Sequence, residues 1–139
     1  MNSIIEKLKT TLNEIPAITA AYIFGSTVDG SKITNDIDII VLTLIPSEFQ
    51  QHYLEFISKI ADALNVKPDK IDLLAFDLNL ADPEIIYRAI DEGIMLKNTN
   101  PDFLSDKIES LSRFFLENEY LLKENKRYRK ERLEEFCVD

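Results

Sequence analysis

The sequence predicts an α+β fold, a mixed sheet flanked by helices with a C-terminal helical extension. Short apolar runs that end at glycine, proline or polar residues alternate with longer segments whose apolar residues recur at helical spacing. With 139 residues, 45% of them hydrophobic, the chain can fill one modest core. We expect residues 1–100 to carry the sheet and residues 101–139 to form a helical extension of the same domain.

The first three elements are expected within residues 1–44. Apolar residues recur at helical spacing from Ile4 to Leu12, which predicts an amphipathic helix. The run ITAAYIF (18–24) is short and partly β-branched or aromatic, and it stops at Gly25, so it predicts a strand. DIDIIVLTL (36–44) predicts a second strand, antiparallel to the first if the connection folds back locally.

Two more strands and a helix are expected between residues 70 and 97. KIDLLAF (70–76) reads as a strand and IMLK (94–97) as a small edge strand. Between them, residues 82–93 predict a helix with Asp82 as its N-cap and Gly93 as its C-terminal stop.

Two further segments have helical periodicity. Residues 46–65 keep one apolar face, which predicts a single helix starting at Pro46, with the only histidine, His52, solvated in its middle. From Pro101 to the end there is no glycine and no further proline, which indicates one long helix or a helical hairpin. Its aromatic residues Phe114, Phe115 and Tyr120 are interpreted as packing residues, within the chain or against a partner.

Charge and cysteine content exclude several classes of protein. The formal net charge of -9 disfavours binding to a nucleic-acid backbone, which needs clustered positive charge. The basic stretch 123–132 is interleaved with glutamates, so a salt-bridged solvent face is the better interpretation. The lone Cys137 allows no intramolecular disulfide, and no run is apolar enough for a membrane span. We expect a cytoplasmic protein without a membrane or nucleic-acid partner.

Three aspartates stand at the starts of otherwise apolar strands. Asp36 and Asp38 share one side of the second strand, and Asp72 lies near the start of the third. If these strands are neighbours, three carboxylates converge and repel one another, a conflict that a hard divalent cation such as Mg²⁺ resolves. The alternative is structural: a turn cap, an aspartate paired with a lysine, and a solvated edge residue.

Taken together, these motifs resemble the DNA polymerase beta-type nucleotidyltransferases. The resemblance consists of a strand followed by Gly25 and Ser26, a short glycine-containing loop, the Asp36-Ile37-Asp38 pair on the next strand and Asp72 on a later one. It covers residues 18–97 well and the C-terminal part loosely. Chain length and the stretch from Lys70 to Leu96 resemble the minimal nucleotidyltransferases, antitoxins whose partners are HEPN-domain RNase toxins.

The resemblance implies a site and a reaction. Gly25 and Ser26 would bind the β and γ phosphates of ATP, and Asp36 and Asp38 would hold two Mg²⁺ ions. Asp72 would be the third carboxylate and metal ligand, near the attacking hydroxyl. The implied reaction is the transfer of AMP to a hydroxyl, a tyrosine of the HEPN toxin, with release of pyrophosphate.

Two departures from the family pattern leave alternatives open. Asp29 occupies the position where the family loop usually has arginine, and the interval from Ser26 to Asp36 is one residue shorter than the commonest pattern. An acid beside a triphosphate adds repulsion unless it turns outward. The alternatives are an antitoxin that acts by binding alone and a small-molecule nucleotidyltransferase. The sequence also leaves open the acceptor, the preferred nucleotide and a homo-oligomeric state.

Overall fold

The computed structural model describes residues 2–25 and 36–118. The chain divides into two compact units, Met1–Ser105 and Asp106–Asp139. In the described part of the chain, no helix is both long and apolar enough to cross a membrane.

The first unit is built on a four-stranded sheet with the order β3-β2-β1-β4. Its strands are β1 (Ile18–Phe24), β2 (Ile37–Thr43), β3 (Ile71–Ala75) and β4 (Ile94–Asn98). β1 is antiparallel to both β2 and β4, and β2 is parallel to β3. The predicted α+β fold is therefore confirmed, as is the antiparallel pairing of the first two strands.

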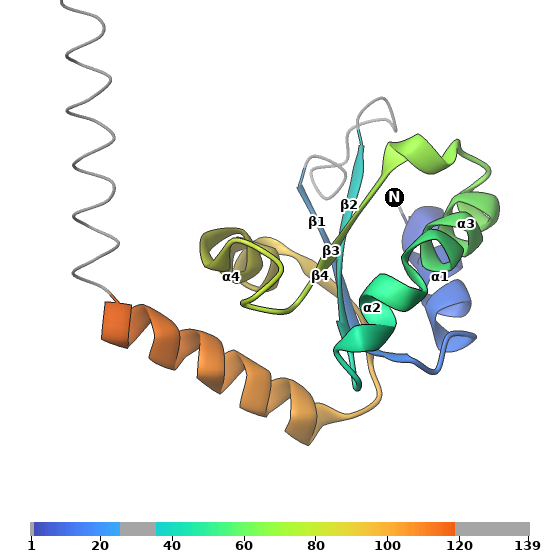
Figure 1. The fold of residues 1–139 in the computed structure, drawn as a ribbon. Helices are drawn as coiled ribbons and strands as arrows, with labels where there is room; N and C mark the ends of the chain where they lie inside the picture. Colours follow the sequence, from blue (N-terminus) through green and yellow to red (C-terminus); the bar gives the residue numbers. More distant parts are fainter. Residues whose placement is uncertain (1, 26–35, 119–139) are drawn as a thin grey trace, which may run out of the picture. The chain divides into compact units, whose positions relative to one another are not determined.

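Helices cover both faces of the sheet, as Figure 1 shows. α1 (Asn2–Asn13) and α3 (Tyr53–Leu64) lie against one face, and α4 (Pro83–Glu92) crosses the other. A 3₁₀ turn, η2 (Pro68–Lys70), leads into β3. Because both faces are covered, every residue of β1 is buried.

The apolar core between α1, α3 and the sheet decides which way the strand side chains point. Ile37, Ile39 and Val41 of β2 belong to this core. Side chains alternate along a strand, so the intervening Asp38 projects from the opposite face, the one that α4 crosses. The core thereby places the acidic side chains on the α4 face of the sheet.

The single helix predicted from Pro46 is wrong. The structure has a short helix α2 (Ser47–Gln51), then a break at His52, then α3. The backbone of His52 has φ -114° and ψ 16°, outside the helical region, and its carbonyl accepts the N–H of Phe56 at 2.9 Å to begin α3. Phe49 and Tyr53 pack edge to face across the break. The helical spacing of apolar residues therefore continues through His52, and the sequence pattern does not reveal the break.

A bulge in β4 turns one lysine into the core. Tyr22 pairs with Met95, and the preceding Ala21 pairs with Lys97. Leu96 is therefore an extra residue in β4 with no register partner on β1. Lys97 therefore points to the face opposite Met95. Its Nζ donates to the carbonyl oxygens of Leu12 at 2.6 Å and Ile15 at 2.8 Å, at the C-terminal end of α1.

A helix over residues 101–118 follows β4. It begins after Asn100, whose Oδ1 accepts the N–H of Phe103 at 3.3 Å, with proline in the first position. Within the second unit, Phe114 and Phe115 pack edge to face. The predictions for Tyr120 and for the basic stretch 123–132 lie outside the described residues.

Candidate functional site

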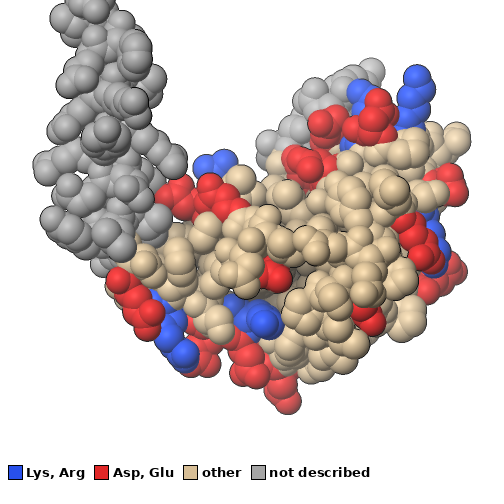
Figure 2. Space-filling view, viewed as in Figure 1, with Lys and Arg blue, Asp and Glu red and all other residues tan. Residues whose placement is uncertain are grey.

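The candidate site lies at the end of the sheet where β2 and β3 begin. Asp38 of β2 and Asp72 of β3 are register partners in the parallel pair. Directly paired residues of neighbouring strands point to the same face, so their side chains share the α4 face. Asp36 stands two residues before Asp38 and is exposed. Figure 2 shows acidic side chains at this end of the sheet, with basic side chains beside them.

The two paired aspartates interact unfavourably when both are charged. The pKa of Asp38 is raised from 3.8 to about 6, first by burial, then by a hydrogen bond with Asp72, then by the negative charges of Asp72 and Asp36. A hydrogen bond between two carboxyl groups requires a proton, so protonated Asp38 donates it to Asp72. When both carboxyl groups are charged, they repel each other, and a bound cation would reduce this repulsion.

Gly25 forms one wall of the site, at the end of β1. Its φ is +81°, in the left-handed region that glycine adopts without strain. A Cβ added to Gly25 would overlap the Oδ2 of Asp38. The preceding residue, Phe24, is the register partner of Asp38 on β1. The glycine thus makes room for the carboxylate of Asp38, a contact that the sequence did not predict.

Not every predicted site residue can be placed. Ser26, and Asp29 in the position where the family usually has arginine, lie outside the described residues. Asp36, Asp38, Asp72 and Gly25 are described, and the structure brings Asp38 together with both Asp72 and Gly25. The sequence did not predict that Phe24, directly before Gly25, pairs in register with Asp38.

The carboxylates of the site suit one mode of divalent-cation binding. Within residues 2–25 and 36–118, no group of three or more histidine, cysteine or acidic side chains is arranged to hold a metal ion. Mg²⁺ is commonly bound by only one or two carboxylates and completes its shell with water and substrate phosphates. Asp38 and Asp72 supply two such oxygen donors on one face, so the residues present fit Mg²⁺ in this mode.

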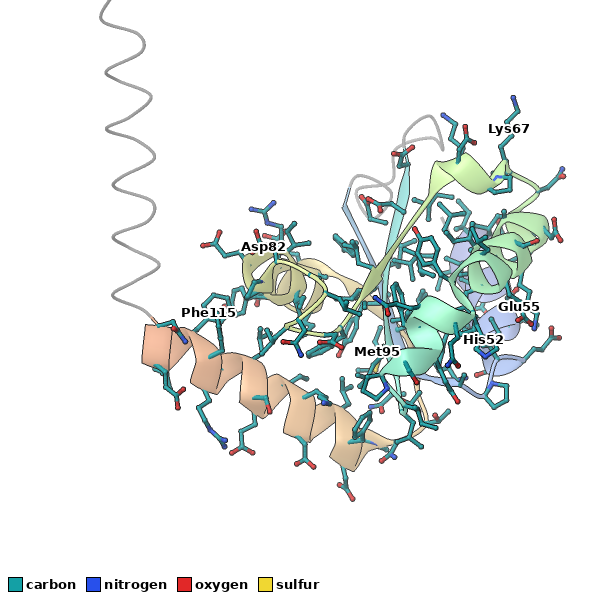
Figure 3. The ribbon with its side chains drawn as sticks, viewed as in Figure 1. His52, Glu55, Lys67, Asp82, Met95 and Phe115 are labelled. Carbon is teal, nitrogen blue, oxygen red and sulfur yellow. The ribbon has the colours of Figure 1, made fainter. Side chains whose placement is uncertain are left out.

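The histidine interacts with a glutamate of α3 and not with the acidic pair. His52 is exposed, and its Nδ1 lies 3.2 Å from the Oε2 of Glu55. Figure 3 labels both side chains. Lys59 pairs with the same glutamate at 3.3 Å. Exposed ion pairs of this kind contribute little to stability. The prediction of a solvated histidine is confirmed, although it lies at a helix break.

Comparisons with known proteins give a family and a set of folds. The family model described as "Polymerase beta, Nucleotidyltransferase" matches residues 6–102, more than half of the 139-residue chain. No curated protein matches the chain in sequence.

Similar solved structures are toxin–antitoxin complexes. A chain of a toxin–antitoxin structure with AMP-PNP is 23% identical, with a TM-score of 0.62, and the match covers 88% of this chain and 98% of that one. A chain of the MntA–HepT toxin–antitoxin structure is 22% identical, with a TM-score of 0.60, covering 91% and 99%. In a third, a tri-AMPylated HEPN toxin from Shewanella oneidensis is in complex with an MNT antitoxin; identity is 24%, the TM-score 0.58, and coverage 88% and 96%. These likenesses concern the fold.

Proposed function

Because this chain belongs to the polymerase beta nucleotidyltransferase family, we propose that it is an antitoxin that transfers AMP from ATP to a tyrosine hydroxyl of a HEPN RNase toxin and thereby neutralises the toxin. The observation that carries the proposal is the pairing of Asp38 with Asp72 in register on one face of the sheet. Two carboxylates kept together at a cost in repulsion are typical of a site that works with a cation.

Each residue of the site has a proposed role. Asp36 and Asp38 would hold Mg²⁺, with Asp72, the register partner of Asp38, as a further carboxylate ligand, and the backbone at Gly25 and Ser26 would approach the β and γ phosphates. When bound, Mg²⁺ would neutralise phosphate charge and stabilise the entering and leaving oxygens. Asp72 accepts the proton of the acceptor hydroxyl. The hydroxyl oxygen bonds to the α-phosphorus, the bond to the bridging oxygen breaks, and pyrophosphate leaves.

The choice of acceptor draws on the structural neighbours. They are toxin–antitoxin complexes, one with AMP-PNP and another with an AMPylated toxin. These descriptions support a nucleotide substrate and a toxin partner for this chain too. AMP on the tyrosine adds a bulky anion, which would oppose RNA binding by the toxin.

A second candidate is an antitoxin that acts by contact alone. Asp29 favours it, because an acid four positions after Gly25 in the sequence would repel a triphosphate bound there.

Two labelled forms of ATP separate these candidates. The chain is co-purified with a HEPN RNase toxin and incubated with Mg²⁺ and ATP labelled at either the α or the γ phosphorus. AMP transfer puts the α label, and not the γ label, on the toxin. Asp38→Asn should abolish labelling, whereas Asp62→Asn, a matched change at an exposed position of α3, should leave it unchanged. A stable complex that takes up neither label would support the contact-only antitoxin and reject the transferase.

A further inference from the structure

β3 is a short edge strand without a lysine, a proline or a bulge. Among the described residues, its one strand neighbour is β2. Its register runs from Ile71 to Ala75 without a shift, whereas β4, at the other edge, is bulged. Natural edge strands are commonly protected by lysine, proline or a bulge. β3 has none of these, and its one charged residue is Asp72 of the candidate site.

The outward-facing backbone groups of β3 can be assigned. The N–H of Phe76 donates to the carbonyl of Val41 at 2.8 Å, so Phe76 faces β2. Backbone groups alternate along a strand, so Asp72 and Leu74 also direct their N–H and C=O groups toward β2. Ile71, Leu73 and Ala75 therefore direct theirs away from the sheet.

A strand added at this edge would reach the site. Asp72 is exposed and shares its face with its register partner Asp38. On a neighbouring strand every second side chain would lie on that same face, and the Cβ of the one opposite Asp72 would be about 5 Å from the Cβ of Asp72. The edge and the acidic pair thus form one continuous surface.

We propose that the acceptor enters as an extended peptide segment that pairs its main chain with β3 and presents its hydroxyl side chain beside Asp72. This inference rests on the proposed transfer to a protein hydroxyl, and it names how the acceptor is held. The site indicates what binds at this edge. The acceptor hydroxyl must reach Asp72, and because Asp72 lies on the edge strand, a peptide strand paired with β3 would bring its side chain there. Main-chain pairing supplies affinity, and the alternation of side chains supplies orientation.

Amide hydrogen exchange measured by NMR tests the docking independently of transfer. The probe is a nine-residue peptide of alternating threonine and valine with a central tyrosine, added at millimolar concentration to the full chain with Mg²⁺ and AMP-PNP. Exchange at Leu73 and Ala75 should slow at least tenfold on addition of peptide. Exchange at Asp72 and Leu74, whose amides face β2, should change less than twofold and serves as the internal control.

A proline substitution provides a second test. Ala75→Pro removes an outward amide without removing a bond to β2, and should weaken peptide binding at least tenfold. The matched control is Asn98→Pro on the other edge strand. Thr99 donates its N–H to Thr19 at 2.8 Å, so the amide of Asn98 points away from β1. Asn98→Pro should leave peptide binding unchanged.

The outcomes separate this inference from the proposed function. Slowed exchange at Leu73 and Ala75, together with a toxin that receives no AMP from ATP, supports the docking and rejects the transfer. AMP on the toxin without slowed exchange by the peptide supports the transfer and overturns the docking. If both amides already exchange slowly before peptide is added, and exchange slows further as protein concentration rises, a second copy of the chain occupies the edge. This result would also overturn the docking.

Discussion

Asp38 and Asp72 face each other across the parallel β2–β3 pair, and burial with the neighbouring negative charge raises the pKa of Asp38 to about 6. The fold thus holds together two groups that repel one another at neutral pH. Functional sites commonly carry such a cost, because the arrangement favours a ligand over the empty state.

The first prediction concerns stability and pH. The folded pKa of Asp38 lies above its ordinary 3.8, so its contribution to stability is complete below pH 3.8 and is lost as pH rises through about 6. Asp38→Asn should therefore raise the unfolding temperature at pH 7.5 and have little effect near pH 4. Thermal unfolding at both pH values checks this, with Asp62→Asn as control. An equal effect of Asp38→Asn at the two pH values would contradict it.

The second prediction separates binding from turnover. Asp72→Asn keeps an amide oxygen that can still bind Mg²⁺ but cannot accept the proton of the acceptor hydroxyl, so it should retain affinity for Mg²⁺-ATP within a few-fold. Its rate should fall by about 100-fold or more, the usual scale for loss of a general base. Calorimetric titration gives the affinity, and pyrophosphate release gives the rate. Unchanged turnover would remove Asp72 from the mechanism.

The third prediction concerns the wall of the site. An alanine at Gly25 would adopt φ +81° at a cost of about 1 to 2 kcal/mol, and its Cβ would displace the carboxylate of Asp38. Gly25→Ala should weaken nucleotide binding and lower stability. In an Asp38→Ala background its cost in urea unfolding should be smaller, because the overlap is gone. Equal costs in the two backgrounds would show that Gly25 and Asp38 do not interact.

The fourth prediction concerns the lysine that the β4 bulge places at the end of α1. Burial lowers the pKa of Lys97, and its Nζ is bonded to the carbonyls of Leu12 and Ile15. Lys97→Met should destabilise the chain by about 1 to 3 kcal/mol, because these carbonyls lose their donor. Lys59→Met, which removes an exposed ion pair, should cost less than about 1 kcal/mol. Comparable losses in urea unfolding would contradict the assigned role of Lys97.

Local signals predicted much of the fold. The strand predicted at residues 18–24 is β1, because a β-branched and aromatic run ends at a glycine. α4 begins as expected, with the Oδ1 of Asp82 accepting the N–H of Glu84 at 2.9 Å. Both features depend on neighbouring residues, which a sequence displays directly.

The features that were not predicted depend on tertiary contacts. The break at His52 leaves the apolar spacing intact, so periodicity does not reveal it. The bulge that buries Lys97 depends on pairing with β1, and lysine is ordinarily expected at the surface. For the site, the sequence proposed Asp38 and Asp72 as neighbours only if their strands were adjacent, and the sheet order provides that adjacency.

The mass of the toxin, purified from cells that co-express it with this chain, tests the proposed transfer most directly. After incubation with Mg²⁺-ATP, the toxin should gain about 329 Da, the mass of one AMP group, on a tyrosine. When this chain carries both Asp38→Asn and Asp72→Asn, the co-expressed toxin should gain no mass. A stable complex whose toxin gains no mass under these conditions would contradict the account and leave an antitoxin that acts by contact alone.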